Sequence, residues 1–199
     1  LRNCALTDAG GTALCDCLRA NPALQHVFLS ENELTRTSGV LLGRMLAGNT
    51  TLRELALRGN YLGDDALSTI GASLKTNTAL TKLDVADTGV STKGVAHVAS
   101  ALAVNSAVVR LDLSWNSLGQ KDIDCLAEAL RANTTLTALN LGSELASNSS
   151  DAMSKGVKAV LKRNMAAAQV GGADCDMGMK GLDLKGVAAL LGTLKPNTA

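Results

Sequence analysis

The sequence predicts an α/β solenoid whose repeating unit is 28 residues long. The first observation is that apolar residues recur on one grid, at this step, along almost the whole chain. Self-similarity at a fixed period of roughly 20–50 residues is typical of repeat architectures. The second observation is that each unit begins with leucines spaced as in a short strand and continues with the three- and four-residue spacing of a helix. Each unit is therefore expected to pack only against its neighbours.

The clearest unit runs from Leu52 to Asn77. Its strand half ends near Asn60, whose amide is expected to bond neighbouring backbone as the chain leaves the strand. Equivalent positions of successive units form a column, and in the other units the column of Asn60 holds Cys4, Asn32, Thr88 and Asn116. Its helix half presents one apolar face, formed by Ala66, Leu67, Ile70 and Leu74. Four successive units keep the step without slippage, and Leu1, Cys4 and Leu6 form the tail of an earlier strand segment.

Two further columns belong to the helix halves. Asparagines mark the predicted helix ends, where Asn tolerates a left-handed backbone; they are Asn21, Asn49, Asn77, Asn105 and Asn133. Glycines within the predicted helices would weaken isolated helices. We therefore expect them to be points of close packing between adjacent units; they are Gly10, Gly11, Gly39, Gly71 and Gly94.

The grid breaks twice near the end of the chain. The segment between Leu141 and Met153 is three residues too long, which places an irregular insertion near 142–150. A second insertion, near 165–172, follows Asn164 and is five residues over the period. Insertions in repeat proteins lie in loops, often on a binding face. They can also be neutral, because a short extra loop costs little closure entropy.

Composition limits the class of partner. The chain has 19 Lys and Arg against 18 Asp and Glu, and this balance disfavours a general nucleic-acid or membrane surface. No apolar run approaches the roughly 18 residues of a spanning helix. The five cysteines match neither a CxxC pair nor a zinc ribbon, and four of them fall in columns expected to be buried or partly buried. Free apolar thiols of this kind favour a reducing, cytoplasmic setting.

Motifs for catalysis are absent from the sequence. It contains no P-loop, no GxSxG and no HExxH, and His26 and His97 are expected in different structural layers. We therefore predict no catalytic residue, no metal site, no cofactor and no small-molecule substrate. Asp84 and Asp112 share a strand column and should lie about 5 Å apart. Paired carboxylates can perform acid/base chemistry, but a binding-surface ladder is the preferred interpretation.

Candidate binding residues come from the columns that point away from the core, because alternate strand residues face opposite sides. Trp and Arg are frequent interface anchors. The predicted partner-binding residues are Trp115, Arg110, Arg58, Phe28, Lys82, Asp84 and Asp112, with Lys82 and Arg110 compensating the two aspartates. An alternative is that Trp115 lies on the flank and covers the loop before Leu118.

A secondary basic patch lies on the helix after the first insertion. Its residues are Lys155, Lys158, Lys162 and Arg163. The three lysines share one helix face because they are spaced by three and four residues. They could bind an acidic partner or phosphates, or they could simply form the solvated outer face that every solenoid helix requires.

These motifs resemble a known family. The pattern L-x-x-L-x-L-x-x-N-x-L followed by G/A-x-x-x-L-x-x-x-L-x-x-N resembles the ribonuclease-inhibitor-like class of leucine-rich repeat over essentially the entire chain. The opening LRNCALTDAGGTALCDCLRANPAL resembles repeats of NOD-like receptors and ribonuclease inhibitors. The uniform step is similar to repeats in Ran GTPase-activating protein, tropomodulin and leucine-rich proteins of the cilium. The resemblance implies a horseshoe with parallel strands on the concave face and helices on the convex face.

The combined expectation is a single domain, 1–199, of about six and a half repeats. Both ends stop in mid-pattern, so we expect a fragment of a longer chain. We predict a non-catalytic protein–protein interaction scaffold, a subunit of a larger assembly that binds protein through its concave face or irregular loops. The resemblance suggests the cytoskeleton or the cilium as its location. The alternative is a regulatory domain of a GTPase-activating protein or NOD-like receptor.

Overall fold

The computed structural model describes residues 1–142 and 151–168. Helices and three-residue strands alternate along this part of the chain. The elements are α1 (Asp8–Ala20), β1 (His26–Phe28), α2 (Arg36–Gly48), β2 (Glu54–Ala56), α3 (Gly63–Leu74), β3 (Lys82–Asp84), α4 (Thr92–Leu102), β4 (Arg110–Asp112), α5 (Gln120–Ala132), β5 (Ala138–Asn140) and α7 (Asp151–Ala168).

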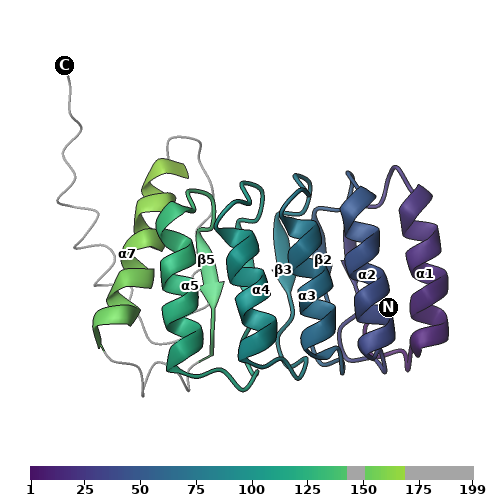
Figure 1. The fold of residues 1–199 in the computed structure, drawn as a ribbon. Coiled ribbons are helices and arrows are strands. Elements are labelled where there is room, and N and C mark those ends of the chain that lie inside the picture. The colour runs from purple at the N-terminus through teal and green to yellow at the C-terminus, as the bar shows by residue number, and fades with distance from the viewer. Residues whose placement is uncertain (143–150, 169–199) are drawn as a thin grey trace.

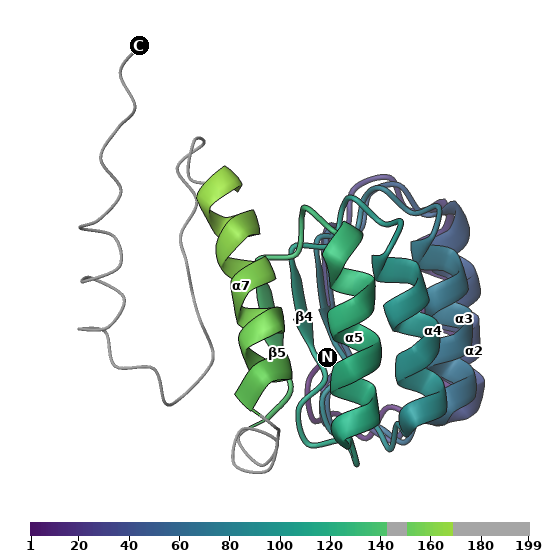
Figure 2. The ribbon, with the colours of Figure 1, turned by 60° about the vertical axis from the view of Figure 1, so that its left-hand side comes forward.

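The five strands form one parallel sheet in the order of the chain, β1-β2-β3-β4-β5. Each strand residue pairs with the residue 28 positions later, as Glu54 does with Lys82. The helices stand side by side in a second layer that covers one face of the sheet (Figure 1). Turned about its vertical axis, the molecule shows β4 and β5 between α7 and α5, with α4, α3 and α2 beyond α5 (Figure 2). The predicted α/β solenoid of 28-residue repeats is confirmed.

The core lies between the two layers and is aliphatic. The central residue of each strand is buried, and it is Val27, Leu55, Leu83, Leu111 or Leu139. The helix faces predicted from the three- and four-residue spacing are buried too, as for Leu67, Ile70 and Leu74 of α3. A leucine side chain gains roughly 1.5–3 kcal/mol on full burial, so the repeated grid supplies the main driving force for stacking.

The first asparagine column behaves as the sequence predicts. The Asn60 amide donates from Nδ2 to the carbonyl oxygens of Leu57, 2.7 Å away, and Leu29, 3.0 Å away. Its Oδ1 accepts the backbone N–H of Leu34 at 3.1 Å. One side chain therefore ties the end of its own strand to the preceding unit. At Thr88 the hydroxyl still donates to its own strand, to the carbonyl of Val85.

The second asparagine column corrects a prediction. These residues are not left-handed, since Asn49 has φ −81° and ψ 123°, which is extended backbone. Except at Asn21, their amides instead join units, as at Asn105, where Nδ2 donates to Leu74 O at 2.7 Å and to Asn77 O at 3.0 Å. The Asn105 Oδ1 accepts the N–H groups that follow it in the chain, including that of Val108 at 2.8 Å. Asparagine is required there because its Nδ2 donates to the preceding unit while its Oδ1 accepts from the residues that follow it.

Glycines in the helices allow close approach between neighbouring units, as predicted. A Cβ on Gly71 of α3 would lie 2.8 Å from the His97 carbonyl oxygen of α4. On Gly39 of α2 it would lie 2.4 Å from the Cβ of Ala66 in α3. Such distances leave no room for a side chain. The backbone of one helix therefore contacts backbone of the next at Gly71 and a small side chain of the next at Gly39.

Two expectations about the ends of the chain are revised, and two others fall on residues that the structure does not describe. The tail predicted at Leu1–Leu6 is not a strand. It still joins the next unit, through the N–H of Asn3 to the Ser30 oxygen at 3.0 Å. Helix α7 continues to Ala168, so the first part of the insertion predicted near 165–172 is helical. The insertion near 142–150 falls, after Gly142, outside the described residues, as does the unit predicted beyond 168.

The cysteines are less covered than the sequence suggests. Cys15 is buried and Cys125 is partly buried, but Cys4 and Cys17 are exposed, which contradicts the expectation of four covered thiols. Burial raises the pKa of the Cys15 thiol to about 11, so it stays protonated near neutral pH. Cys175 lies outside the described residues. A search of the described helices for a segment with the length and hydropathy of a membrane span finds none.

Candidate protein-binding face

The strand face turned away from the helices is hollowed. Side chains from all five strands line an open concavity with a volume of about 500 Å³. The lining includes Phe28, Lys82, Asp84, Arg110 and Asp112, five of the seven predicted binding residues. The register brings equivalent residues of adjacent strands side by side, which creates the rows of side chains that the sequence predicts.

The row nearest the strand starts is held by ion pairs. The Glu54 carboxylate accepts from His26 Nδ1 at 3.1 Å and lies 3.5 Å from Lys82 Nζ. Lys82 therefore neutralises Glu54 of the neighbouring strand, and not the aspartates as the sequence predicts. Arg110 continues the row on β4, opposite Lys82. These groups are half-exposed, so each pair contributes little stability on its own and keeps its charges accessible to a partner.

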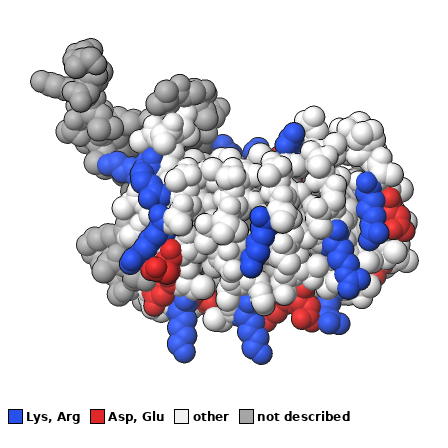
Figure 3. All heavy atoms as spheres, turned by 45° about the horizontal axis from the view of Figure 1, so that its top comes forward, with Lys and Arg blue, Asp and Glu red and all other residues white. Residues whose placement is uncertain are grey.

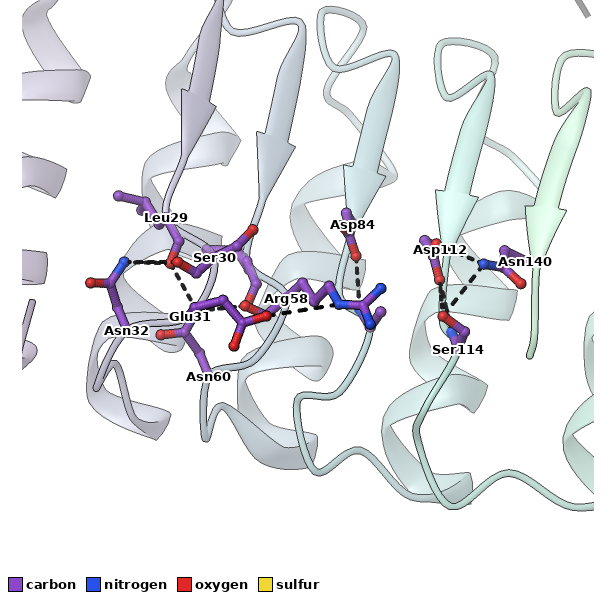
Figure 4. Close-up of polar contacts among 12 residues, drawn as sticks. Leu29, Ser30, Glu31, Asn32, Arg58, Asn60, Asp84, Asp112, Ser114 and Asn140 are labelled. Carbon is purple, nitrogen blue, oxygen red and sulfur yellow. Dashed lines mark hydrogen bonds and ion pairs between the residues drawn. The ribbon is translucent and has the colours of Figure 1, made fainter. Parts of the chain in front are cut away.

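The two aspartates lie in register in the next row. Both carboxylate oxygens of Asp112 accept hydrogen bonds, Oδ1 from the Ser114 hydroxyl at 2.6 Å and Oδ2 from Asn140 Nδ2 at 2.8 Å (Figure 4). Asp84 accepts the N–H of Ala86 at 3.0 Å. Burial, together with the neighbouring Asp112 charge, raises the pKa of Asp84 above its ordinary value. The Asp84 carboxylate would therefore gain from a cation brought by a partner.

Arg58 extends from the end of β2 along the third row. Its guanidinium Nε lies 4.0 Å from a carboxylate oxygen of Glu31, in the turn after β1 (Figure 4). The Arg58 charge also opposes the rise in the pKa of Asp84. Arg58 thus stands between the concave face and the turns that follow the strands.

The aromatic side chains are all exposed. Phe28 is 48% exposed and stacks on the His26 ring, with centroids 6.5 Å apart and planes 8° from parallel. Trp115 is 66% exposed and does not line the concavity. Tyr61, in the turn after β2, is 79% exposed and was missed by the sequence analysis. The signal available in the sequence was that Tyr61 is the sole tyrosine of the chain, in a column just beyond the strand.

The predicted basic patch divides into two parts. Lys158 and Lys162 are exposed on α7. Arg163 instead donates hydrogen bonds to the backbone oxygens of Arg131 and Asn133, which joins α7 to the end of α5. Only the helical position of Lys155 is described. On the helix side of the molecule, basic side chains are spread between uncharged ones and gather most at the α7 end (Figure 3).

Within 1–142 and 151–168, no group of three or more His, Cys, Asp or Glu side chains is arranged to hold a metal ion.

Comparison with known families agrees with this geometry. A leucine-rich repeat family model matches residues 48–71 and 76–99, which are consecutive units of the solenoid. The described part of the chain has a leucine-rich repeat fold. The leucine-rich repeats of this chain also resemble solved structures. A structure of leiomodin-1 actin-binding site 2 has a TM-score of 0.71 at 24% identity, covering 78% of this chain and 90% of that one.

A second solved structure is the tropomodulin C-terminal domain from Caenorhabditis elegans. It has a TM-score of 0.71 at 15% identity, and the match covers 80% of this chain and 96% of that one. At these identities the likeness shows the leucine-rich repeat fold alone. A comparison with curated protein sequences finds no match.

Proposed function

We propose that this leucine-rich repeat domain is a non-catalytic protein-binding module that receives its partner on the concave face. The observation that carries the proposal is the ordered array of charged side chains, with Phe28 at its edge, around a concavity of about 500 Å³. The strands hold this array over a tightly packed core, so binding requires little ordering of the face itself.

The aspartate pair favours recognition over acid/base chemistry. Both Asp112 oxygens are engaged by Ser114 and Asn140, so this carboxylate has a structural role in the row. A general acid or base also needs a site that encloses the reacting group, whereas this concavity is open and spans five strands. Asp84 and the nearby cations Lys82, Arg110 and Arg58 are suited to ion pairs with a partner.

The larger setting follows from the same proposal. We infer that the domain is one component of a larger, cytoplasmic assembly, and that a cytoskeletal assembly is the first to consider. The leiomodin-1 structure is described as an actin-binding site, which makes actin the first purified protein to test. No residue role is carried over from leiomodin-1, since its identity with this chain is 24%.

The test combines one defined partner with one unbiased search. Purified actin is assayed by co-sedimentation with the domain. In parallel, the immobilised domain captures proteins from cytosol, and the bound proteins are identified and quantified by mass spectrometry. The wild type is compared with Arg110→Ala and with Lys82→Ala. Lys121→Ala, a change of the same kind on the exposed side of α5, is the matched control.

We expect at least one protein whose capture falls severalfold in both concave-face variants and is unchanged in the α5 variant. Circular dichroism of each variant checks that the fold is retained. If every captured protein binds the concave-face variants as well as the wild type, the concave face is not the binding site. If actin fails but another protein shows the expected pattern, the binding function stands with a different partner.

A further inference from the structure

The three aromatic residues of this chain are absent from the core and lie on one side of the molecule. Phe28, Tyr61 and Trp115 are its sole phenylalanine, tyrosine and tryptophan, and all three are exposed. Aromatic side chains gain more from burial than most residues. Their placement on the strand side, and in the turns that leave the strands, is the distribution expected of interface anchors.

Tyr61 and Trp115 belong to turns that are joined to one another by backbone hydrogen bonds. The N–H of Glu31 donates to the Arg58 oxygen at 2.7 Å, that of Gly59 to the Asp87 oxygen at 3.1 Å, and that of Asp87 to the Ser114 oxygen at 2.9 Å. The sheet is thereby prolonged beyond the strands as a continuous edge. The backbone that carries these side chains is therefore fixed before any partner arrives.

Trp115 is an unusual residue for its backbone conformation. It has φ +59°, and the equivalent residues of the other units, Asn3, Glu31, Gly59 and Asp87, also have positive φ. Glycine, asparagine and aspartate tolerate this left-handed region, whereas a bulky side chain is costly there. Neither backbone preference nor core packing explains a tryptophan at this position. Such strain is characteristic of residues kept for recognition.

The same turns carry acidic side chains. Glu31, Glu33 and Asp87 are exposed, and Glu31 lies 4.0 Å from the Arg58 guanidinium. Among the described residues no ion pair is made by Glu33 or Asp87. Glu31, Glu33 and Asp87 outnumber the arginines of the same edge, Arg2 and Arg58, by three to two. The edge is therefore negatively charged overall, and its complement is a surface rich in lysine or arginine.

We propose that Glu31, Glu33, Tyr61, Asp87 and Trp115 form a docking rim for a basic protein segment whose apolar side chains cover the two aromatics. This inference deepens the proposed function, on which it rests, by naming the chemistry of the partner. The turns of Tyr61 and Trp115 are two strand spacings apart, about 10 Å. This is close to one three-residue turn of a polyproline II segment, in which residues three apart lie on the same face. A segment with apolar residues three apart, and lysines between them, can reach both aromatics and the carboxylate of Asp87.

The rim contains its own reporter, because Trp115 is the only tryptophan of the chain. The probe is a short synthetic peptide in which each leucine is followed by two lysines, and the control peptide has glutamate in place of every lysine. Each is titrated into the intact chain while Trp115 emission is followed. The double variant Glu33→Lys/Asp87→Lys tests the rim charges. Glu128→Lys, on the exposed face of α5, is the matched charge reversal elsewhere.

We expect the lysine peptide to shift Trp115 emission to shorter wavelength, saturably, and the glutamate peptide to leave it unchanged. Affinity should fall roughly tenfold or more in the rim double variant, and salt should weaken wild-type binding. Glu128→Lys should bind as the wild type does. Equal binding of both peptides, or an undiminished affinity in the rim variant, would overturn the proposal. A concentration-dependent shift without peptide would assign the rim to a second copy of the chain instead.

The failure of this inference is distinguishable from failure of the proposed function. If Arg110→Ala and Lys82→Ala abolish capture of a partner while the rim double variant captures it normally, the concave face binds alone and the rim is not used. If none of these variants changes capture, both proposals fail together.

Discussion

Asn105 offers the sharpest test of how the units are held together. It is 6% exposed, and its amide donates to the carbonyl oxygens of Leu74 and Asn77 while accepting the N–H groups of Ala107 and Val108. Asn105→Ala removes all four hydrogen bonds and supplies no replacement. The backbone donors and acceptors that remain are buried or partly buried between two units, where water has poor access.

The expected cost follows from those groups. A buried donor or acceptor left without a partner costs about 1–3 kcal/mol. Counting only the two groups on the most buried residues, the N–H of Val108 and the carbonyl of Leu74, the loss should be about 2–6 kcal/mol. That is a large share of the roughly 5–15 kcal/mol that stabilises a typical domain. The substitution should therefore come close to unfolding the solenoid at this point.

Urea unfolding followed by circular dichroism measures the loss, and amide hydrogen exchange locates it at Val108 and its neighbours. Asn21→Ala is the matched control, because Asn21 accepts from Ala23 and Leu24 but lies half-buried in the first unit. It should cost about 1 kcal/mol or less. If Asn105→Ala proves as mild as Asn21→Ala, the amide bridges do not hold the units together and the reasoning fails.

Three further predictions concern packing, charge and the rim. Gly71→Ala should lower the free energy of unfolding by about 1–3 kcal/mol, because the new Cβ overpacks against α4. Gly156→Ala places no atom within 4 Å of its new Cβ and should raise the free energy of unfolding by about 0.5–1 kcal/mol. Urea midpoints that shift in the same direction would contradict this prediction. Burial and Asp112 raise the pKa of Asp84 above its ordinary value of 3.8, so wild-type stability falls as the pH rises from 3.8 through the raised pKa. Asp84→Asn should therefore stabilise the fold near pH 7 and lose that effect below pH 3.8. A gain in stability that is independent of pH would refute this prediction. Trp115→Asn should leave stability unchanged or raise it by up to about 1 kcal/mol, since asparagine tolerates positive φ; a large loss in thermal unfolding would show that Trp115 packs structurally.

The fold could be predicted from the sequence because the regularly spaced leucines are the residues that become buried. Leu83 and Leu111 occupy the same column and prove to be paired central residues of adjacent strands. The pairing of Asp84 with Asp112 followed from the same arithmetic. The reason for the helix-end asparagines could not be read in this way, because a left-handed cap and an amide bridge select the same residue. Only the extended backbone of Asn49 separates the two.

The candidate rim was harder to anticipate for a different reason. Tyr61 lies in an exposed turn, where the column pattern of the core does not constrain the residue type. The positive φ of Glu31 and Trp115 has no sequence signature, since neither residue type favours it. Likewise, the pairing of Lys82 with Glu54 depends on how far a flexible side chain reaches across a strand. Such features become visible only once the backbone is placed.

Within each set of equivalent asparagines, the number of residues between hydrogen-bonded partners is constant from unit to unit, and this has an evolutionary consequence. Asn60 reaches Leu34 across 26 residues, and Asn105 reaches Leu74 across 31. When a whole 28-residue unit is deleted or duplicated, each donor finds an equivalent acceptor in its new neighbour. An insertion or deletion of part of a unit leaves the donor without one. Deleting residues 77–104 would place β2 beside β4 and bring the turns of Tyr61 and Trp115 next to each other. A gene of this kind can thus change the spacing of its recognition residues in whole-unit steps while the fold survives.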